Sequence, residues 1–318
     1  MVGSSANKPR NGHPKDNNTI VSSTLGDKIL MTAVYAFLWL ALIVTLYPLL
    51  YICSASISDP KYVNSGQMWL FPMGITLDGY SKLLGNSEIW LGYRNTLIYA
   101  AGGTVVSLII TLTCGYGLAK KSLPGKNIVM VFLMVTMFFS GGLIPSFIWI
   151  KRFKMLDTIW AIIIPGAASV WNIIITRTYI QNSIPNELEE AAEIDGCSPF
   201  LTFFRIVLPL SAPIIAVMAL YAAVGRWNSY FQELIYLQTR TKFPLQVFLR
   251  EQLIVAQMMQ NADGTLAADA AITMAEQAKL ADIIKYAVMV VATLPIILVY
   301  PFLQRFFVKG IMVGSVKG

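Results

Sequence analysis

The chain is poor in charged residues, and this shortage bounds its class before any motif is considered. Asp, Glu, Lys and Arg make up 13% of its 318 residues, whereas soluble domains contain about 25%. Hydrophobic residues account for 56%, and the mean hydropathy is +0.61. Because a soluble fold of this size could not bury such long apolar runs, the composition predicts an integral membrane protein with one membrane domain.

Histidine and cysteine are also scarce, which excludes several kinds of catalytic site. His13 is the only histidine and lies in a polar stretch, so no His-based triad or multi-histidine metal site can form. Cys53, Cys114 and Cys197 lie far apart and match no metal-ligand spacing. The chain also lacks a Gly-x-x-x-x-Gly-Lys-Ser/Thr run for binding nucleotide phosphates. We therefore expect a protein that is not an enzyme and that binds no metal or cofactor itself.

Six apolar runs are long enough to cross a bilayer. About 20 helical residues span about 30 Å of hydrocarbon, and lipid requires each segment to satisfy its own backbone groups. The predicted spans are 28–54, 95–119, 127–150, 158–180, 210–232 and 283–304. The ten-residue alternation of a transmembrane barrel is absent. The residues thus predict an all-α integral membrane domain with six helices over 27–318, preceded by a disordered tail over 1–26.

Lysines and arginines beside the spans predict the orientation. They gather in the N-terminal tail, in the connection 120–126 and after the sixth span, three regions that share one side of a six-span topology. The positive-inside rule makes that side cytoplasmic, with both termini inside, although Lys151, Arg152 and Lys154 disagree. The net charge of +7 is then explained by topology and lipid headgroups, and no nucleic-acid partner is expected.

Two long connections are predicted on the outer side, 55–94 and 238–282. The first contains tryptophans and a tyrosine typical of a membrane interface. The second contains an amphipathic pattern that begins at Leu245 and predicts a helix lying on the surface. Two interpretations of these loops stay open: contact with an extracellular delivery protein, or a lid over the helices.

Glycines and prolines inside the spans predict close packing and kinks. Gly102-Gly103, Gly115-x-Gly117 and Gly141-Gly142 are typical of sites where helices approach each other or bend. Pro145 and Pro165 are expected to kink or end helices.

A polar hairpin of about residues 183–209 separates the fourth and fifth spans. Pro185 is suited to the first turn of a helix, and the glutamates that follow it place negative charge at the positive end of the helix dipole. Gly196 is suited to end that helix in the left-handed conformation, and Ser198-Pro199 to begin a second short helix. Small alanines would let another surface approach closely. The hairpin is therefore interpreted as a docking element for a protein, since an acidic helix would be repelled by anionic lipid.

The spacing within this hairpin resembles a known motif. It reads Glu190-Ala191-Ala192, then Gly196 after three residues, then Ile206-x-Leu208-Pro209 after nine. This pattern is similar to the EAA loop of binding-protein-dependent ABC importer permeases. The runs 141–145, 225–230, 244–250 and 308–318 resemble the carbohydrate-uptake branch, namely maltose-type second permeases and the polysaccharide and oligosaccharide permease group.

The resemblance implies a MetI-like transmembrane domain that forms half of the path for a sugar, with a coupling helix on the cytoplasmic side. Two permeases pair in that family, two ABC ATPase subunits bind the EAA loops, and an extracytoplasmic binding protein delivers the sugar. ATP and magnesium would be bound by the ATPase, in a bacterial cell membrane, and the second permease would be a distinct paralogue. The implied ATPase-coupling residues are Glu190, Ala191, Ala192, Asp195, Gly196, Leu208 and Pro209.

A sugar path needs aromatic faces for the rings and amide or charged groups for the hydroxyls. Residues of this kind occur in the fourth span and in the outer half of the fifth: Trp171, Asn172, Tyr221, Arg226, Trp227, Asn228 and Tyr230. For Arg226, Trp227 and Tyr230, anchoring at the membrane interface stays equally open.

Two other functions remain as alternatives. The chain could be an ABC permease for another small solute, or an ion-coupled carrier. The second alternative predicts acidic residues within the membrane for coupling, and the spans contain almost none.

Overall fold

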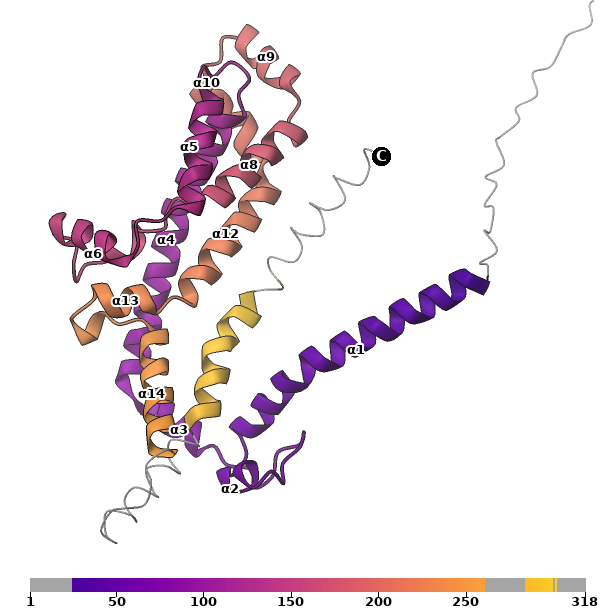
Figure 1. Ribbon diagram of the computed structural model, residues 1–318, viewed down its shortest axis with the longest axis vertical. Coiled ribbons are helices and arrows are strands. Elements are labelled where there is room, and N and C mark those ends of the chain that lie inside the picture. Colours follow the sequence, from indigo (N-terminus) through magenta and orange to yellow (C-terminus); the bar gives the residue numbers. More distant parts are fainter. Residues whose placement is uncertain (1–24, 261–283, 300, 302–318) are drawn as a thin grey trace, which may run out of the picture. The chain divides into compact units, whose positions relative to one another are not determined.

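The computed structural model describes residues 25–260, 284–299 and 301, and these residues form helices and loops without a β-strand. The all-α fold class is thus confirmed (Figure 1). Most of the predicted tail, the second half of the outer loop 238–282 and the end of the sixth span lie outside the described residues. The helices are α1 (Leu25–Ser56), α2 (Pro60–Asn64), α3 (Asp78–Gly85), α4 (Ser87–Ala119), α5 (Lys126–Phe138), α6 (Leu143–Arg152), α7 (Trp160–Ile163), α8 (Val170–Ser183), α9 (Asn186–Ile194), α10 (Pro199–Thr202), α11 (Leu208–Leu210), α12 (Ala212–Trp227), α13 (Phe231–Tyr236), α14 (Leu245–Gln260) and the unlabelled helix Ile284–Val299.

The chain divides into two units at Leu50. The described part of the first unit is the apolar body of α1, whose side chains are exposed along its length. Apolar side chains on every face of a helix are typical of a membrane span. The second unit, from Tyr51 onward, contains the other helices and is described below by itself.

Two of the predicted spans are continuous helices long enough to cross a membrane, α1 and α4. The second begins at Ser87 rather than at 95, so the first outer loop ends earlier than predicted. The reason is a helix cap: the Asn86 side chain accepts a hydrogen bond from the backbone N–H of Glu88 at 2.9 Å. A cap of this kind starts a helix among polar residues, where hydropathy gives no signal.

The third, fourth and fifth spans were predicted as single helices, and this continuity is wrong. The third consists of α5 and α6, which are bent by 112° relative to each other. Gly142, the residue before α6, has a φ of 84°. The fourth is interrupted between α7 and α8 at Pro165-Gly166. The fifth ends at Trp227, and the segment Pro199–Leu210 meets α12 at 81°. At the breaks in the third and fourth spans, Gly142 and Gly166 have positive φ and Pro165 lacks a backbone donor, which an apolar run cannot reveal by its length.

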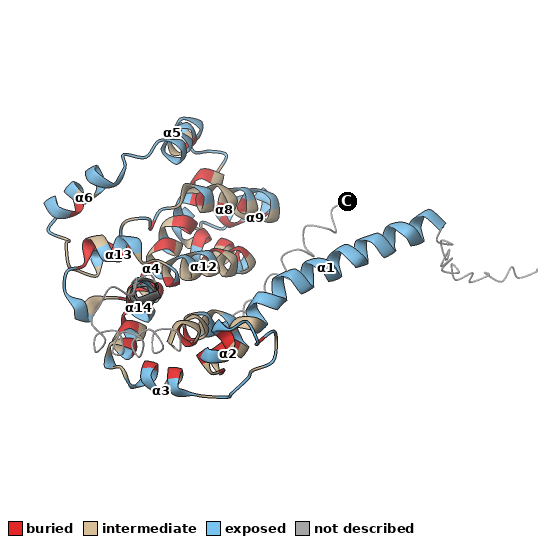
Figure 2. Cartoon of the chain, turned by 60° about the horizontal axis from the view of Figure 1, so that its bottom comes forward, coloured by how far each residue is buried: buried red, intermediate tan, exposed pale blue. Residues whose placement is uncertain are grey.

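Helix α4 is the centre of the second unit, with α8, α12 and α14 packed against it. Figure 2 shows buried residues on these helices, while α5 and α6 are mostly exposed. The α4–α8 approach is close at Gly115, because a β-carbon there would lie 2.7 Å from Thr176 Cγ2. No atom lies within 4 Å of a β-carbon placed on Gly117. The close-packing prediction is therefore confirmed for Gly115, whereas Gly117 has no such contact within the described part of this chain.

This difference gives a matched pair of variants within one helix. Gly115→Ala is expected to destabilise the protein by about 1–3 kcal/mol, the usual cost of overpacking a tight contact. Gly117→Ala is expected to be neutral or to stabilise by up to about 1 kcal/mol, since alanine favours a helix. Thermal unfolding of both purified variants in detergent measures the contrast. An equal loss of stability in both would contradict the assigned α4–α8 contact.

Candidate functional site

The first helix of the polar hairpin, α9, begins at Asn186, with Pro185 as the residue that precedes its first turn. Pro185 was predicted inside that turn. Its extended backbone (φ −61°, ψ 139°) places it one position earlier, where its missing N–H costs nothing. Glu187 and Glu189 lie in the first turn, as the helix dipole favours. Only Ala192 of this helix is buried.

Gly196 ends α9 as the sequence predicts. Its φ is 79°, its N–H donates to the Glu193 carbonyl at 3.0 Å, and the Cys197 N–H donates to the Ala192 carbonyl at 2.8 Å. These two bonds define a Schellman motif, which satisfies the last carbonyls of the helix. A β-carbon on Gly196 would meet nothing within 4 Å. The requirement for glycine is therefore conformational rather than steric.

The return segment of the hairpin is a succession of short helical turns. The Ser198 hydroxyl caps α10 by accepting from the Leu201 N–H at 3.3 Å, with Pro199 at the first helical position. A π-helical turn over Phe203–Val207 follows, and α11 then contains Leu208 and Pro209. Because Pro209 has no N–H, the carbonyl four residues before it cannot form the regular helical bond. The wider π turn is consistent with that missing donor.

The base of the hairpin is fixed to the end of α4. Lys120 Nζ lies 3.6 Å from Glu189 Oε2 and 4.9 Å from the centre of the Tyr116 ring. The Tyr116 and Phe203 rings pack with centroids 5.0 Å apart, within a buried cluster that includes Val207. An ion pair and an aromatic contact thus hold both arms of the hairpin on one rigid helix.

The tip of the hairpin, in contrast, is exposed and combines acidic with apolar side chains. Ile194 is 86% exposed and Phe200 74%. Four acidic residues of the tip form no ion pair within the described part of the chain: Glu187, Glu190, Glu193 and Asp195. Of the predicted coupling residues, Glu190, Ala191, Asp195 and Gly196 are exposed, whereas Ala192 is buried and Leu208 is half-buried. Large exposed apolar residues on a fixed base are typical of a protein-binding surface.

A hollow of about 730 Å³ lies between α8, α12 and the residues that follow α12. It brings together most of the predicted substrate-path residues: Asn172, Tyr221, Arg226, Asn228 and Tyr230. Its volume lies within the range of about 300–1,000 Å³ that ligand sites usually have. Asn228 and Tyr230 were placed within the fifth span, and this is wrong: α12 ends at Trp227, so both residues lie on the loop beyond it.

The structure does not bring the two predicted tryptophans to this hollow. Trp171 is 58% exposed at the start of α8 and is not part of the lining. Trp227 is 6% exposed, and its indole N–H donates to the Ala292 carbonyl at 3.0 Å. It packs with Ile89 and Val288 in an apolar cluster. Its contacts make it a core residue.

Arg226 connects α12 to the break in the fourth span. Its guanidinium donates to the carbonyls of Ile162, Ile163 and Pro165, the last two at 2.8 and 3.3 Å. Gly103 leaves room for it, since a β-carbon there would lie 2.8 Å from Arg226 Nε. These carbonyls are the ones that the end of α7 leaves without helical donors. The sequence could not reveal this role, because the partners are backbone atoms far away in the chain.

On the predicted outer side, Asp157 joins two loops. Its carboxylate accepts from the backbone N–H groups of Gln238 and Thr239, both at 3.0 Å, and from Lys242 Nζ at 2.6 Å. The Lys242 ammonium and the Thr239 donors hold the pKa of Asp157 well below its ordinary value. Because the pKa is lowered in the folded state, this carboxylate contributes stability above about pH 4, and the contribution decreases as the pH falls below that value.

Asp157→Asn is therefore expected to lower the melting temperature at pH 7 and to make it less sensitive to acid. The amide keeps one acceptor oxygen but faces the Lys242 ammonium with a donor. Melting curves of the purified protein between about pH 7 and pH 3 measure both effects. Asp78→Asn, at an exposed position in α3, is the control. Parallel pH curves for wild type and Asp157→Asn would contradict this prediction.

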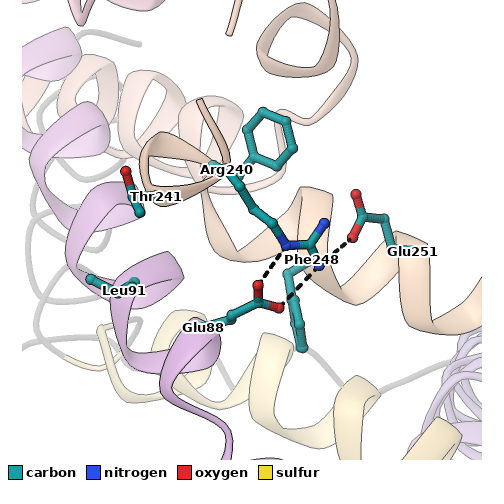
Figure 3. A pocket seen from close by; sticks show the side chains of 7 residues that line it. Glu88, Leu91, Arg240, Thr241, Phe248 and Glu251 are labelled. Atoms are coloured by element: carbon teal, nitrogen blue, oxygen red, sulfur yellow. Dashed lines mark hydrogen bonds and ion pairs between the residues drawn. The ribbon is translucent and has the colours of Figure 1, made fainter. Parts of the chain in front are cut away.

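A second, smaller pocket lies where the chain after α13 meets α4 and α14 (Figure 3). Its volume is about 110 Å³, well below that of usual ligand sites. Figure 3 shows Arg240 between two carboxylates, with the guanidinium 3.0 Å from Glu88 Oε2 and 3.2 Å from Glu251 Oε2. These ion pairs fasten α14, which was predicted to lie on the surface, to α4. Its buried Leu245 and Phe248 complete that contact, so the apolar face of the predicted amphipathic helix packs on α4.

Comparison with known proteins follows this geometry. The family described as "Binding-protein-dependent transport system inner membrane component" matches residues 19–313. The chain is 40% identical to protein LplC of Bacillus subtilis (strain 168) over 276 residues, which cover 86% of this chain and 90% of LplC. It is 39% identical over 285 residues to the polygalacturonan/rhamnogalacturonan transport system permease protein YtcP of the same organism, with coverages of 90% and 97%.

A solved structure is also similar. It belongs to a bacterial ABC transporter involved in the import of the acidic polysaccharide alginate, and the chains share 30% identity with a TM-score of 0.77, over 89% of this chain and 98% of that one. The chain therefore belongs to the family of binding-protein-dependent transport system inner membrane components. It is a transport permease subunit with the MetI-like helical fold, as the EAA-type spacing predicted.

Proposed function

We propose that this chain forms half of the membrane path of an ATP-driven importer for an oligosaccharide, and that a separate ATPase acts on it through α9. The observation that carries the proposal is the exposed tip of the hairpin on a base fixed to α4. A force applied to Ile194 or Phe200 would pass through Tyr116–Phe203 to α4 and through α11 to α12. Rigid helices packed in this way move as units rather than deform.

The proposed partners follow from the surfaces that the chain leaves uncovered. Two copies of the ATPase would supply ATP and magnesium, one for this chain and one for a second, distinct permease. The exposed apolar side chains of α5 and α6 fit lipid or that second permease. An extracytoplasmic binding protein would deliver the sugar to the outer loops. In the proposed assembly, the hairpin and both termini would lie on the cytoplasmic side of a bacterial cell membrane.

The proposed cargo rests on the hollow and on the relatives. A cavity of about 730 Å³ with tyrosines and amides offers ring faces and hydroxyl partners. YtcP is named for polygalacturonan and rhamnogalacturonan, another relative is named as the maltodextrin permease MdxG of Bacillus subtilis, and the similar solved transporter is described as importing alginate. Each of these names refers to a carbohydrate built of linked sugar units.

Reconstitution tests this function directly. The complex that co-purifies with the tagged chain would be placed in liposomes with its binding protein, and uptake of a labelled tetragalacturonate would be measured. We expect uptake to require internal ATP and to be unchanged when ion gradients are collapsed. Uptake that continues without ATP under a proton or sodium gradient would instead establish the ion-coupled carrier.

A further inference from the structure

Another hollow, of about 510 Å³, adjoins the hollow of about 730 Å³ between α8 and α12. Asn228 and Tyr230 belong to the linings of both, so the loop after α12 separates two neighbouring cavities. The far side of the second hollow is formed by α14, which contributes Arg250, and by the helix Ile284–Val299. Arg250 ends the run 244–250 that resembles the carbohydrate-uptake branch, but the sequence alone assigned it no role of its own. A lone arginine within an amphipathic helix resembles any solvated residue.

The two linings are strongly asymmetric in charge. Together they contain Arg226 and Arg250 and, among the described residues, no carboxylate. The guanidinium of Arg226 is occupied by three backbone carbonyls, and the buried Glu233 acts on it electrostatically. Arg250 forms no ion pair within the described part of the chain, and its guanidinium lies 4.4 Å from the centre of the Tyr230 ring. Its charge is thus the one that the hollows leave uncompensated.

We propose that Tyr230 and Arg250 form a binding position for a carboxylate-bearing sugar unit, so that the path is selective for acidic oligosaccharides. This inference rests on the proposed function of sugar import. The planar guanidinium binds a carboxylate with two parallel hydrogen bonds. The tyrosine ring offers an apolar face to the C–H side of a pyranose. A ring stacked on Arg250 also holds the guanidinium in place, which lowers the entropy lost on binding.

The arrangement selects a sugar by its charge rather than by its size. A neutral sugar would stack on Tyr230 equally well, but it would have to desolvate the Arg250 guanidinium without compensation. Arg250→Gln removes the charge and keeps a polar chain of similar reach, while Arg250→Lys keeps the charge as a point without the planar fork. The exposure of Arg250 makes a folding defect in either variant unexpected.

The test compares tetragalacturonate with its methyl ester, which removes the charge of each carboxylate and adds a methyl group, in the reconstituted complex with its binding protein. For Arg250→Gln we expect a loss of about tenfold or more in kcat/KM for uptake of the acid and less than about twofold for the ester, since one charge-assisted contact has roughly that value. Arg250→Lys is expected to lie between wild type and Arg250→Gln. Arg152→Gln is the matched control, because Arg152 also stacks on an aromatic ring, Trp149, outside both hollows.

The outcomes separate this inference from the function on which it rests. If wild type transports the acid but Arg250→Gln loses acid and ester equally, or loses neither, the acidic binding position is overturned and sugar import stands. Direct binding of tetragalacturonate to the permease complex in nanodiscs without the binding protein supplies the second readout: weakening in Arg250→Gln but not in Arg152→Gln supports the position. If wild type transports neither ligand in any reconstitution, the result contradicts the proposed sugar import and, with it, the binding position that rests on it.

Discussion

Gly196→Val is expected to reduce ATP-driven uptake by at least about tenfold while the permease still folds and inserts. The φ of 79° at this position is strained for any residue with a β-carbon, most of all for a β-branched one. The strain of about 1–3 kcal/mol can be relieved only by unwinding the end of α9, which moves the exposed Ile194 and Asp195. Because no atom lies near a new side chain, the defect would come from conformation and not from a clash. Uptake and ATP hydrolysis of the reconstituted complex measure it.

Asparagine provides the control for this prediction. It tolerates the left-handed conformation better than other residues with a β-carbon, so Gly196→Asn should retain much more uptake than Gly196→Val. Gly85→Ala, at an exposed glycine with open space around it, should behave as wild type. Equal loss in the valine and asparagine variants would show that the conformation of this turn is not what matters.

Arg226→Met is expected to have the second large effect, this time on stability as well as on transport. Removing the guanidinium leaves the carbonyls of Ile162, Ile163 and Pro165 without their donor. Buried polar groups left without a partner cost about 1–3 kcal/mol each, so the break between α7 and α8 should loosen. We expect a lower melting temperature and a fall in the maximal rate of uptake, with little change in KM.

Arg226→Lys separates this structural role from substrate binding. A single ammonium cannot reach three carbonyls in the geometry that a guanidinium fork allows, so lysine should rescue only part of the stability. If Arg226 bound substrate instead, lysine would preserve the melting temperature and the effect would appear mainly in KM. Arg152→Met, at an exposed position at the end of α6, is expected to leave both quantities unchanged.

The features that could be predicted from sequence are those that depend on residues close together in the chain. Gly196 and Ser198-Pro199 act within a few residues of themselves, so the turn and the second helix start of the hairpin follow from those residues alone. The apolar spans follow from composition, since lipid imposes helices on them. The EAA-type spacing indicated the family, because all residues of that motif lie within the hairpin.

The features that the sequence could not provide depend on contacts between distant residues. Hydropathy cannot tell where an apolar run bends. Gly142 and Pro165 were predicted as places where helices bend or end, but the spans that contain them were still drawn as single runs. Arg226 is indistinguishable from an interfacial anchor until its three carbonyl partners are seen. Trp227 likewise gave the same signal as a sugar-stacking residue, although its neighbours make it core.

The central claim is that a separate ATPase acts on this chain at the exposed tip of α9, and site-specific photocrosslinking tests it most directly. A benzophenone amino acid would be introduced at Ile194, which is 86% exposed, and for comparison at Trp69, which is 78% exposed in the connection 55–94 that is predicted on the outer side. The account predicts a crosslink from position 194 to an ATPase subunit of the assembled importer, and none from position 69. Crosslinks from position 194 to lipid alone, or none to the ATPase while the complex hydrolyses ATP, would contradict it.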